Sequence, residues 1–233
     1  MRHTEAEEET HRFYETRGCH WSSTRLAADY WEPELCQFRQ LLASGSILDA
    51  GCGNGRDYDF FRRVGYSYTG IDVSSQMLAI ARDNHPDGAF ASMDVCDLAF
   101  DSLAFDGIWC VAVLLHFPKA VVDRPLQELC RVLRKGGVVF FAVRDGSREY
   151  MSEEQEGTQR FFAEYSVDEL SDRLSQSGLT PIHVCTRDAP GEDQARWTTA
   201  FAVKGEVEGS HQEVMGGHKS SHRHDSIIQQ VSF

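Results

Sequence analysis

The first 45 residues carry apolar side chains at helical spacing. From Leu26 to Leu42 these side chains recur every three or four positions, which is the period of an amphipathic helix. Pro33 interrupts the repeat and is expected to begin a new helix, because proline is favoured in a first helical turn. A segment of this length has too few apolar residues for its own core. We therefore predict that residues 1–45 form a helical cap on the rest of the chain.

Beyond residue 45, short apolar runs alternate with segments of helical period. The predicted strands are Ile47–Ala50, Ser67–Ile71, Ala89–Met93, Phe105–Val113, Val138–Val143, Thr180–Cys185 and Arg196–Val203. The predicted helices are Arg56–Arg63, Ser75–Asn84 with Ser74 as N-cap, Val121–Leu133 with a stop at Arg134–Gly137, and one from Ser166 closed by Gly178. This alternation predicts an α/β fold with a doubly wound, Rossmann-like sheet.

The end of the α/β segment departs from strict alternation. Residues 145–158 are polar and are predicted to form a loop. The last two predicted strands are joined without a helix, so they must run antiparallel to each other. From residue 205 to 233, glycine, serine, histidine and charge dominate, and we predict a disordered tail there. The expected organisation is a cap (1–45), an α/β domain (46–204) and a tail (205–233).

Composition narrows the possible partners and compartment. At 233 residues and 41% hydrophobic side chains, the chain can bury a single core. A net charge of −13 argues against a nucleic-acid partner, which is bound through clustered Lys and Arg. Part of that negative charge is concentrated in the acidic run Glu5–Glu9, which we expect to lie outside the folded body. Seven scattered cysteines, no apolar leader and no long apolar run predict a cytoplasmic protein outside the membrane.

Two features of the sequence predict a nucleoside-containing cofactor. The strand Ile47–Ala50 ends in Gly51, Gly53 and Gly55, which allow a sharp turn and the close approach of a ligand to the backbone. Asp72, at the end of the second strand, is placed to accept hydrogen bonds from two ribose hydroxyls. A dinucleotide site would have a third glycine in register, and no such glycine follows Gly55 here.

The motifs, in their order, resemble those of the class I S-adenosylmethionine-dependent methyltransferases. The matching segments are Leu48-Asp-Ala-Gly-Cys-Gly-Asn-Gly55, Gly70-Ile-Asp-Val-Ser-Ser-Gln-Met-Leu78, Met93-Asp94, Phe105-Asp-Gly107 and Leu129-Cys-Arg-Val-Leu-Arg-Lys-Gly-Gly137. The resemblance implies a sheet of seven strands with the last one antiparallel, and S-adenosyl-L-methionine as the cofactor.

The same resemblance assigns roles to individual positions. The methionine portion of the cofactor would lie along Asp49, Gly51, Cys52, Gly53 and Val111. Asp72 would bind the ribose, and the adenine would lie among Val73, Met77, Asp94 and Val95. The alternative for Asp94 is a turn cap. No metal is implied, and the tail histidines lack the ordered neighbours that a metal site needs.

Methyl transfer from a sulfonium needs mainly alignment, and a base only where the acceptor holds a proton. His116, directly after the fourth predicted strand, is the candidate base, with a pKa expected near 6.5. A structural loop histidine is the alternative.

Candidates for acceptor binding lie outside the cofactor motifs. The residues Tyr14, His20, Trp21, Tyr30 and Trp31 of the N-terminal segment could fold over the site as a lid. For most of these aromatic residues, ordinary core packing is the expectation. Phe161 is a candidate wall of the acceptor pocket, again with core packing as the alternative. Arg144 would pair with an anionic acceptor or, alternatively, form a surface salt bridge.

The sequence thus favours methylation of a small molecule at oxygen, nitrogen or carbon, by in-line displacement. The alternative is methylation of tRNA or another macromolecule, since some tRNA methyltransferases share a Gly-Cys-Gly-Asn-Gly turn like that at residues 51–55. A nicotinamide-dependent oxidoreductase is disfavoured by the glycine spacing. A non-catalytic relative that only binds the cofactor would show no turnover.

Overall fold

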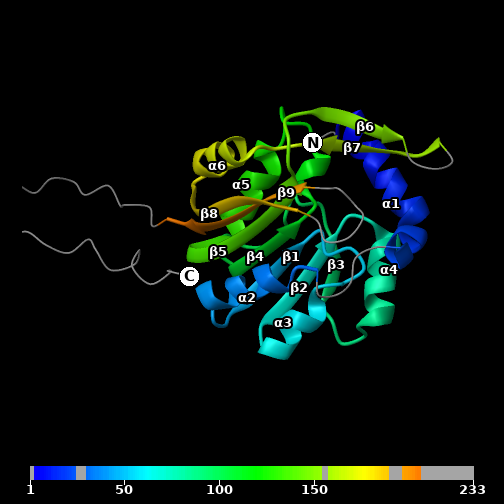
Figure 1. The fold of residues 1–233 in the computed structure, drawn as a ribbon. Coiled ribbons are helices and arrows are strands. Elements are labelled where there is room, and N and C mark those ends of the chain that lie inside the picture. The colour runs from blue at the N-terminus through cyan, green and yellow to red at the C-terminus, as the bar shows by residue number, and fades with distance from the viewer. Residues whose placement is uncertain (1–2, 25–29, 154–156, 189–195, 206–233) are drawn as a thin grey trace, which may run out of the picture.

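The computed structural model describes residues 3–24, 30–153, 157–188 and 196–205 (Figure 1). The strands are β1 (Ser46–Ala50), β2 (Ser67–Asp72), β3 (Phe90–Ser92), β4 (Phe105–Val111), β5 (Leu133–Arg144), β6 (Glu149–Glu153), β7 (Gln159–Ala163), β8 (Leu179–Asp188) and β9 (Arg196–Lys204). The helices are α1 (Glu5–Thr24), α2 (Glu32–Leu41), α3 (Tyr58–Val64), α4 (Ser75–Asn84), the 3₁₀ turn η1 (Leu114–His116), α5 (Asp123–Val132) and α6 (Val167–Gln176). Within these ranges, no helix combines the length and apolar character that crossing a membrane requires.

Seven strands form the main sheet in the order β3-β2-β1-β4-β5-β9-β8. The pairs β2–β3, β1–β2, β1–β4 and β4–β5 are parallel, whereas β9 is antiparallel to both of its neighbours. The predicted seven-stranded sheet with an antiparallel final strand is confirmed. In Figure 1, α2 and α3 lie below the sheet and α5 and α6 above it. Because the parallel strands share one direction, the loops after β1, β2 and β4 meet at the same edge of the sheet.

An aromatic cluster joins α2 and α3 to the centre of the sheet. Phe38 of α2 packs edge-on against Phe61 and Trp109, with ring centroids 6.0 and 5.7 Å apart. Trp109 stacks on Phe140 of the neighbouring strand at 4.3 Å. Trp31 is also fully buried, and it packs against Phe140 and Trp197. Tyr30 and Trp31 therefore belong to the core, as expected for most of these aromatic residues, and do not form a lid.

Helix N-termini follow the predicted capping chemistry. The Ser74 hydroxyl accepts a hydrogen bond from the Met77 N–H at the start of α4. Ser166 does the same for the Glu169 N–H at the start of α6. Each bond satisfies a donor that has no partner within its own helix.

Two parts of the chain differ from the predicted elements. Residues 134–137 were predicted to end the preceding helix, but they belong to the first part of β5. Leu133 already pairs with Phe105, and the register of the β4–β5 pair shifts between Phe105 and Gly107, so that the glycines are accommodated within the strand. The segment predicted as a loop, 145–158, contributes β6 to a β6–β7 hairpin. The pattern concealed β6, since its Tyr150 and Met151 are exposed at adjacent positions instead of alternating with polar residues.

Phe38→Ala should lower the free energy of unfolding by about 3–5 kcal/mol, because it leaves a cavity among three packed rings. Gln40→Ala, on the exposed face of the same helix, should change it by no more than about 0.5 kcal/mol. Urea unfolding of both variants measures the difference. Equal midpoints would mean that α2 does not depend on this cluster.

Candidate functional site

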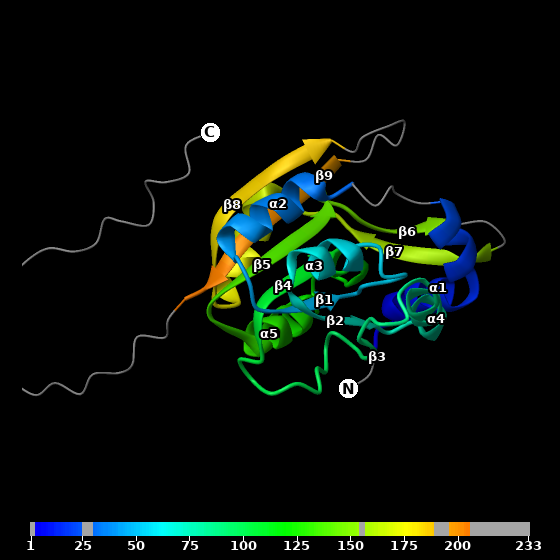
Figure 2. The same cartoon turned by 90° about the horizontal axis from the view of Figure 1, so that it is seen from below.

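A pocket of about 1070 Å³, including its open mouth, lies at the carboxyl edge of the sheet. Its floor comes from the loops after β1, β2, β3 and β4, and α1 covers it. Figure 2 shows α1 beside α4 and the β6–β7 hairpin. The lining residues are His3, Glu7, Glu8, Thr10, His11, Tyr14, Gly51, Gly53, Ile71, Asp72, Val73, Met77, Met93, Asp94, Val95, Ala112, Val113, His116 and Phe117.

The glycine turn after β1 is fixed by the end of β2. The N–H groups of Gly51 and Cys52 donate to the Ile71 carbonyl at 2.8 and 2.9 Å. Gly51 and Gly53 have φ angles of 76° and 54°, a conformation that side-chain-bearing residues rarely adopt. A Cβ on Gly51 would lie 2.2 Å from the Val113 side chain. The turn therefore requires glycine for its own geometry and for its contact with the loop after β4.

Asp72 is held by two backbone donors while it lines the pocket. Its Oδ2 accepts from the Gly53 N–H at 2.9 Å, and its Oδ1 accepts from the Ser74 N–H at 2.8 Å. Burial raises the pKa of Asp72, and these two hydrogen bonds act in the opposite direction. Each oxygen keeps a further lone pair. The carboxylate can thus accept from two adjacent hydroxyls, as a ribose presents them.

One carboxylate oxygen of Asp94 accepts a backbone hydrogen bond, and the other lies near His3. Its Oδ1 accepts from the Cys96 N–H at 2.8 Å, and its Oδ2 lies 3.4 Å from His3 Nε2. Asp94 therefore caps a turn and lines the pocket at the same time. Val73 is 44% exposed, while Met77 and Val95 are buried in the pocket wall beside it.

Asp49 lies beneath the glycine turn, outside the pocket lining. It is 3% exposed, and its Oδ2 accepts from the Tyr68 hydroxyl at 2.7 Å. Burial and the neighbouring Asp57 charge raise the pKa of Asp49 to about 8, although the Tyr68 bond opposes the shift. Asp57 is itself bound by Arg56 through two nitrogens, at 2.8 and 2.7 Å. Cys52 is buried as well, and burial raises the pKa of its thiol.

His116 is buried between α1 and β7, with both ring nitrogens engaged. Its Nδ1 lies 2.7 Å from the Phe161 carbonyl oxygen and must carry the proton of that bond, because a carbonyl only accepts. Nε2 then accepts from the Tyr14 hydroxyl at 3.1 Å. Burial lowers the pKa of His116 to about 3, and the charges of Arg160 and Arg144 add to the shift. The expected pKa near 6.5 is wrong for this histidine, which is neutral at physiological pH.

Of the residues predicted to bind the acceptor, some line the pocket and others do not. Tyr14 lines the pocket. Phe161 lies behind it and contributes its backbone, since its N–H donates to Thr10 Oγ1 at 2.9 Å. Val111 and Arg144 also lie outside the lining, and Arg144 is stacked over Trp197 at 5.0 Å. The side chain of Trp21 falls outside the described residues.

Part of the chain is similar to a known family. Residues 48–141 match the family described as "Methyltransferase domain". This segment, less than half of the 233-residue chain, includes the glycine turn after β1 and Asp72.

The curated proteins that resemble the chain carry names with different acceptors. A malonyl-[acyl-carrier protein] O-methyltransferase of Pectobacterium atrosepticum is 34% identical over 127 residues, which are 49% of this chain and 46% of that protein. The tRNA (carboxymethyluridine(34)-5-O)-methyltransferase alkbh8 of Xenopus tropicalis is 32% identical over 182 residues, 76% of this chain and 28% of that protein. The chain thus spans less than half the length of these curated relatives.

Among solved structures, the fold is shared with the 1,6-didemethyltoxoflavin-N1-methyltransferase of Burkholderia thailandensis. The TM-score is 0.72, with 20% identity over 88% of this chain and 93% of that chain. That structure holds S-adenosylhomocysteine. At this identity the likeness is one of fold.

The pocket has residues that fit S-adenosylmethionine, the cofactor that the sequence resemblance implies. Asp72 has free lone pairs for the ribose, and Gly51 and Gly53 present backbone without side chains to the pocket. Val73 and Val95 supply apolar surface for the adenine. The individual roles of these residues remain predictions.

Sequence reasoning placed Tyr14 over the site but missed the other residues of α1 that line the pocket, which are Glu7, Glu8, Thr10 and His11. The acidic run Glu5–Glu9 lies within the folded body, because α1 begins at Glu5 and Glu7 is 7% exposed. The spacing of Thr4 and Glu7 in the sequence could have predicted that a helix begins at this point. The Thr4 N–H donates to Glu7 Oε2 at 2.7 Å, and the Glu7 N–H donates to Thr4 Oγ1 at 3.3 Å, which is a capping box.

Asp49→Asn should make the cofactor-free protein more stable at alkaline pH. The folded pKa of Asp49, about 8, exceeds its ordinary value of 3.8, so the folded chain keeps a proton that the unfolded chain loses. Wild-type stability should therefore fall as pH rises between about 4 and 8, whereas the asparagine variant should lack this loss. Thermal unfolding across that range tests it, with the exposed Asp83→Asn as the control. Parallel curves for wild type and Asp49→Asn would contradict the prediction.

The His116 ring should not titrate between about pH 5.5 and 8, because its folded pKa is near 3. Histidine-selective NMR measures this, and comparison with His116→Asn assigns the resonance. A midpoint near pH 6.5 for His116 would restore it as a candidate base.

Proposed function

We propose that the protein transfers a methyl group from S-adenosylmethionine to a small-molecule acceptor by in-line displacement. The proposal rests chiefly on one observation. The cofactor-type groups Gly51, Gly53 and Asp72 share a covered pocket with Tyr14 and His116. A site roofed by α1 suits an acceptor that can be enclosed with the cofactor.

The chain's own residues would position the reactants and exclude water. The bound cofactor supplies a methyl group already activated by its sulfonium charge. Asp72 and the glycine turn would fix its nucleoside end, and α1 would keep bulk water away from the reacting atoms. His116 would act as a positioning residue: it holds the Tyr14 hydroxyl in the pocket and is itself held by the Phe161 carbonyl.

Methylation of tRNA is the second candidate. It is supported by the 32% identity to the Xenopus tRNA methyltransferase, which extends over 76% of this chain. The net charge of −13 weighs against it, since RNA affinity depends on clustered Lys and Arg.

The cytoplasm is the proposed compartment. The cysteines of the described ranges are all free: Cys36, Cys52, Cys96, Cys110, Cys130 and Cys185. Unpaired thiols, several of them buried, suit a reducing environment.

Calorimetry should show binding of S-adenosylmethionine and S-adenosylhomocysteine but not of NAD. Asp72→Ala should weaken cofactor binding by roughly 10²-fold or more, because two hydrogen bonds to a charged acceptor are lost, each worth about 1.5–3 kcal/mol. Asp83→Ala, at an exposed position on α4, is the matched control. Wild-type affinity in a folded Asp72→Ala protein would exclude Asp72 from the cofactor site.

The two acceptor classes are separated by a transfer assay with methyl-labelled cofactor. A protein-free cell extract is divided into a small-molecule filtrate and an RNA fraction. Label in the filtrate supports the leading proposal, and label in RNA alone supports the alternative. Cofactor binding without transfer to either fraction would contradict both.

A further inference from the structure

Two hydroxyl side chains of α1, Thr10 and Tyr14, line the pocket on the side that faces β7 and η1. Thr10 is bound to the backbone of Phe161 in β7, and Tyr14 is bound to His116 in η1. On another side of the same helix, Glu15 binds the start of α4. Because α4 follows β2, whose end carries the proposed ribose site, Thr10 and Tyr14 lie toward the acceptor end of the pocket.

The hydrogen bonds of His116 fix the direction in which the Tyr14 hydroxyl acts. His116 Nδ1 carries the ring proton for its 2.7 Å bond to the Phe161 carbonyl oxygen, so Nε2, 3.1 Å from the Tyr14 hydroxyl, is an acceptor. The single hydroxyl proton of Tyr14 therefore goes to His116. Arg160 Nη1 lies 3.4 Å from the same hydroxyl and only donates, so it does not change this assignment. A ligand that bonds Tyr14 must supply the hydrogen itself.

The Thr10 hydroxyl has the opposite polarity. Its oxygen accepts from the Phe161 N–H at 2.9 Å, and its own proton finds no acceptor within the described ranges of the chain. Thr10 is 5% exposed, so a donor without a partner carries a desolvation cost at this position. A ligand atom with a lone pair would remove that cost.

Helix α1 thus presents one donor and one acceptor that are one helical turn apart. Residues four positions apart lie on the same helix face, with Cβ atoms roughly 5–6 Å apart. The backbone of Phe161 fixes both groups, because its N–H holds Thr10 and its carbonyl holds the His116 ring that binds Tyr14. The edge of an amide or lactam carries the complementary pair, a carbonyl oxygen beside an N–H.

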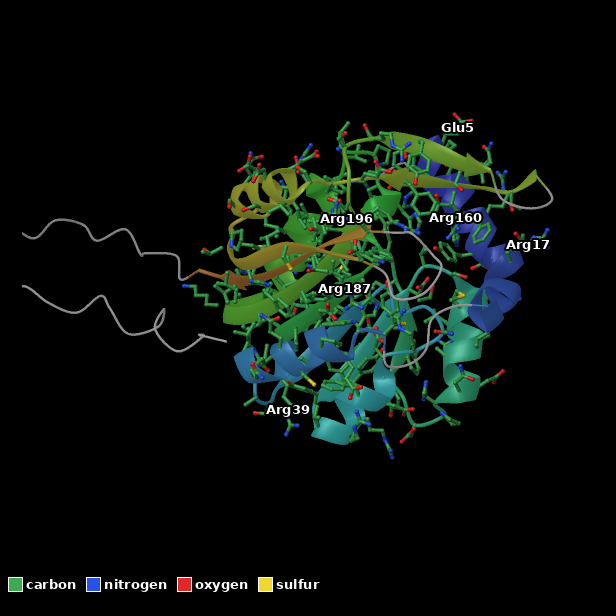
Figure 3. The ribbon with its side chains drawn as sticks, in the orientation of Figure 1. Glu5, Arg17, Arg39, Arg160, Arg187 and Arg196 are labelled. Carbon is green, nitrogen blue, oxygen red and sulfur yellow. The ribbon has the colours of Figure 1, made fainter. Side chains whose placement is uncertain are left out.

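The charges around the pocket do not suit an anionic acceptor. No Lys or Arg occurs in the lining, as far as the structure describes it. Arg160 lies outside the lining, is 6% exposed and stacks on the rings of Phe13 and Phe162 at 4.5 and 5.0 Å. Figure 3 shows it between α1 and the β6–β7 hairpin, where it joins the two. The lining does contain carboxylates, which repel an anion: Glu7, Glu8, Asp72 and Asp94.

We propose that the methyl acceptor is an uncharged compound with an amide- or lactam-type edge, and that Thr10 and Tyr14 bind this edge. The inference rests on the proposed function and names the acceptor class of the same pocket. Thr10 donates to the carbonyl oxygen of the edge, and Tyr14 accepts from its N–H. The two residues determine specificity and orient the acceptor, whose attacking atom lies elsewhere on the molecule. A proton that the acceptor must lose would pass to another lining group, such as His11 or Glu8.

The test uses two matched probes, 2-pyridone and N-methyl-2-pyridone, which differ in that a methyl group replaces the hydrogen of the edge N–H. Each probe is added to the transfer assay at saturating methyl-labelled cofactor, with the small-molecule filtrate as acceptor. In the wild type, 2-pyridone should have an inhibition constant about 3- to 10-fold lower, which corresponds to one neutral hydrogen bond. In Tyr14→Phe this difference should vanish, while cofactor affinity measured by calorimetry stays unchanged.

Tyr150→Phe, on the exposed strand of the β6–β7 hairpin, is the matched control and should keep the wild-type difference between the probes. Thr10→Val should raise the inhibition constants of both probes roughly 3- to 10-fold, because both carry the carbonyl oxygen. Thr10→Ser should restore the wild-type values, since serine keeps the hydroxyl.

Each part of the inference has an outcome that overturns it. A difference between the probes that persists in Tyr14→Phe would come from the bulk of the N-methyl group and would overturn the role of Tyr14. Unchanged inhibition constants in Thr10→Val would remove Thr10 from the acceptor site. Failure of both probes to inhibit transfer would overturn the acceptor class and leave the proposed methyl transfer intact. An absence of any label transfer to the filtrate would refute the proposed function itself.

Discussion

The pocket depends on the attachment of the glycine turn to the end of β2. The Ile71 carbonyl accepts two N–H groups from the turn, and Asp72 accepts a third from Gly53. These bonds join adjacent parallel strands at the point where each leaves the sheet, so the turn cannot shift without displacing Asp72. The residues that would contact the cofactor are therefore positioned by backbone bonds before any ligand arrives, which lowers the ordering cost of binding.

This arrangement has an energetic cost, which arises from charged groups buried beneath the glycine turn. Asp49 is buried beside Asp57, and only one of the two is neutralised by Arg56. A well-packed apolar residue in place of Asp49 would avoid that penalty. A raised pKa of this kind is common where a buried acid stands next to a ligand site, since function and stability then make opposing demands on the same side chain.

The sequence predicted the sheet, its antiparallel strand and the Ser74 and Ser166 caps, because each follows from local spacing or turn chemistry. It did not predict the His116 environment. The Phe161 carbonyl and the Tyr14 hydroxyl are distant in sequence and meet His116 only through tertiary packing, and this packing decides its pKa. The β6–β7 hairpin was missed because its outer strand exposes apolar residues. Core packing of Tyr30 and Trp31 was expected, but helical periodicity does not reveal which face of the sheet a helix covers.

The contacts of α1 have a kinetic consequence. Thr10 and Tyr14 connect this helix to β7 and η1, while Glu15 binds the backbone N–H and hydroxyl of Ser75 at the start of α4. One rigid helix thus spans both ends of the pocket. Any displacement of α1 that frees one end also loosens the other, so spent cofactor and methylated product would depart after a shared opening step. Substitutions along α1 that change this opening would then change both departures together.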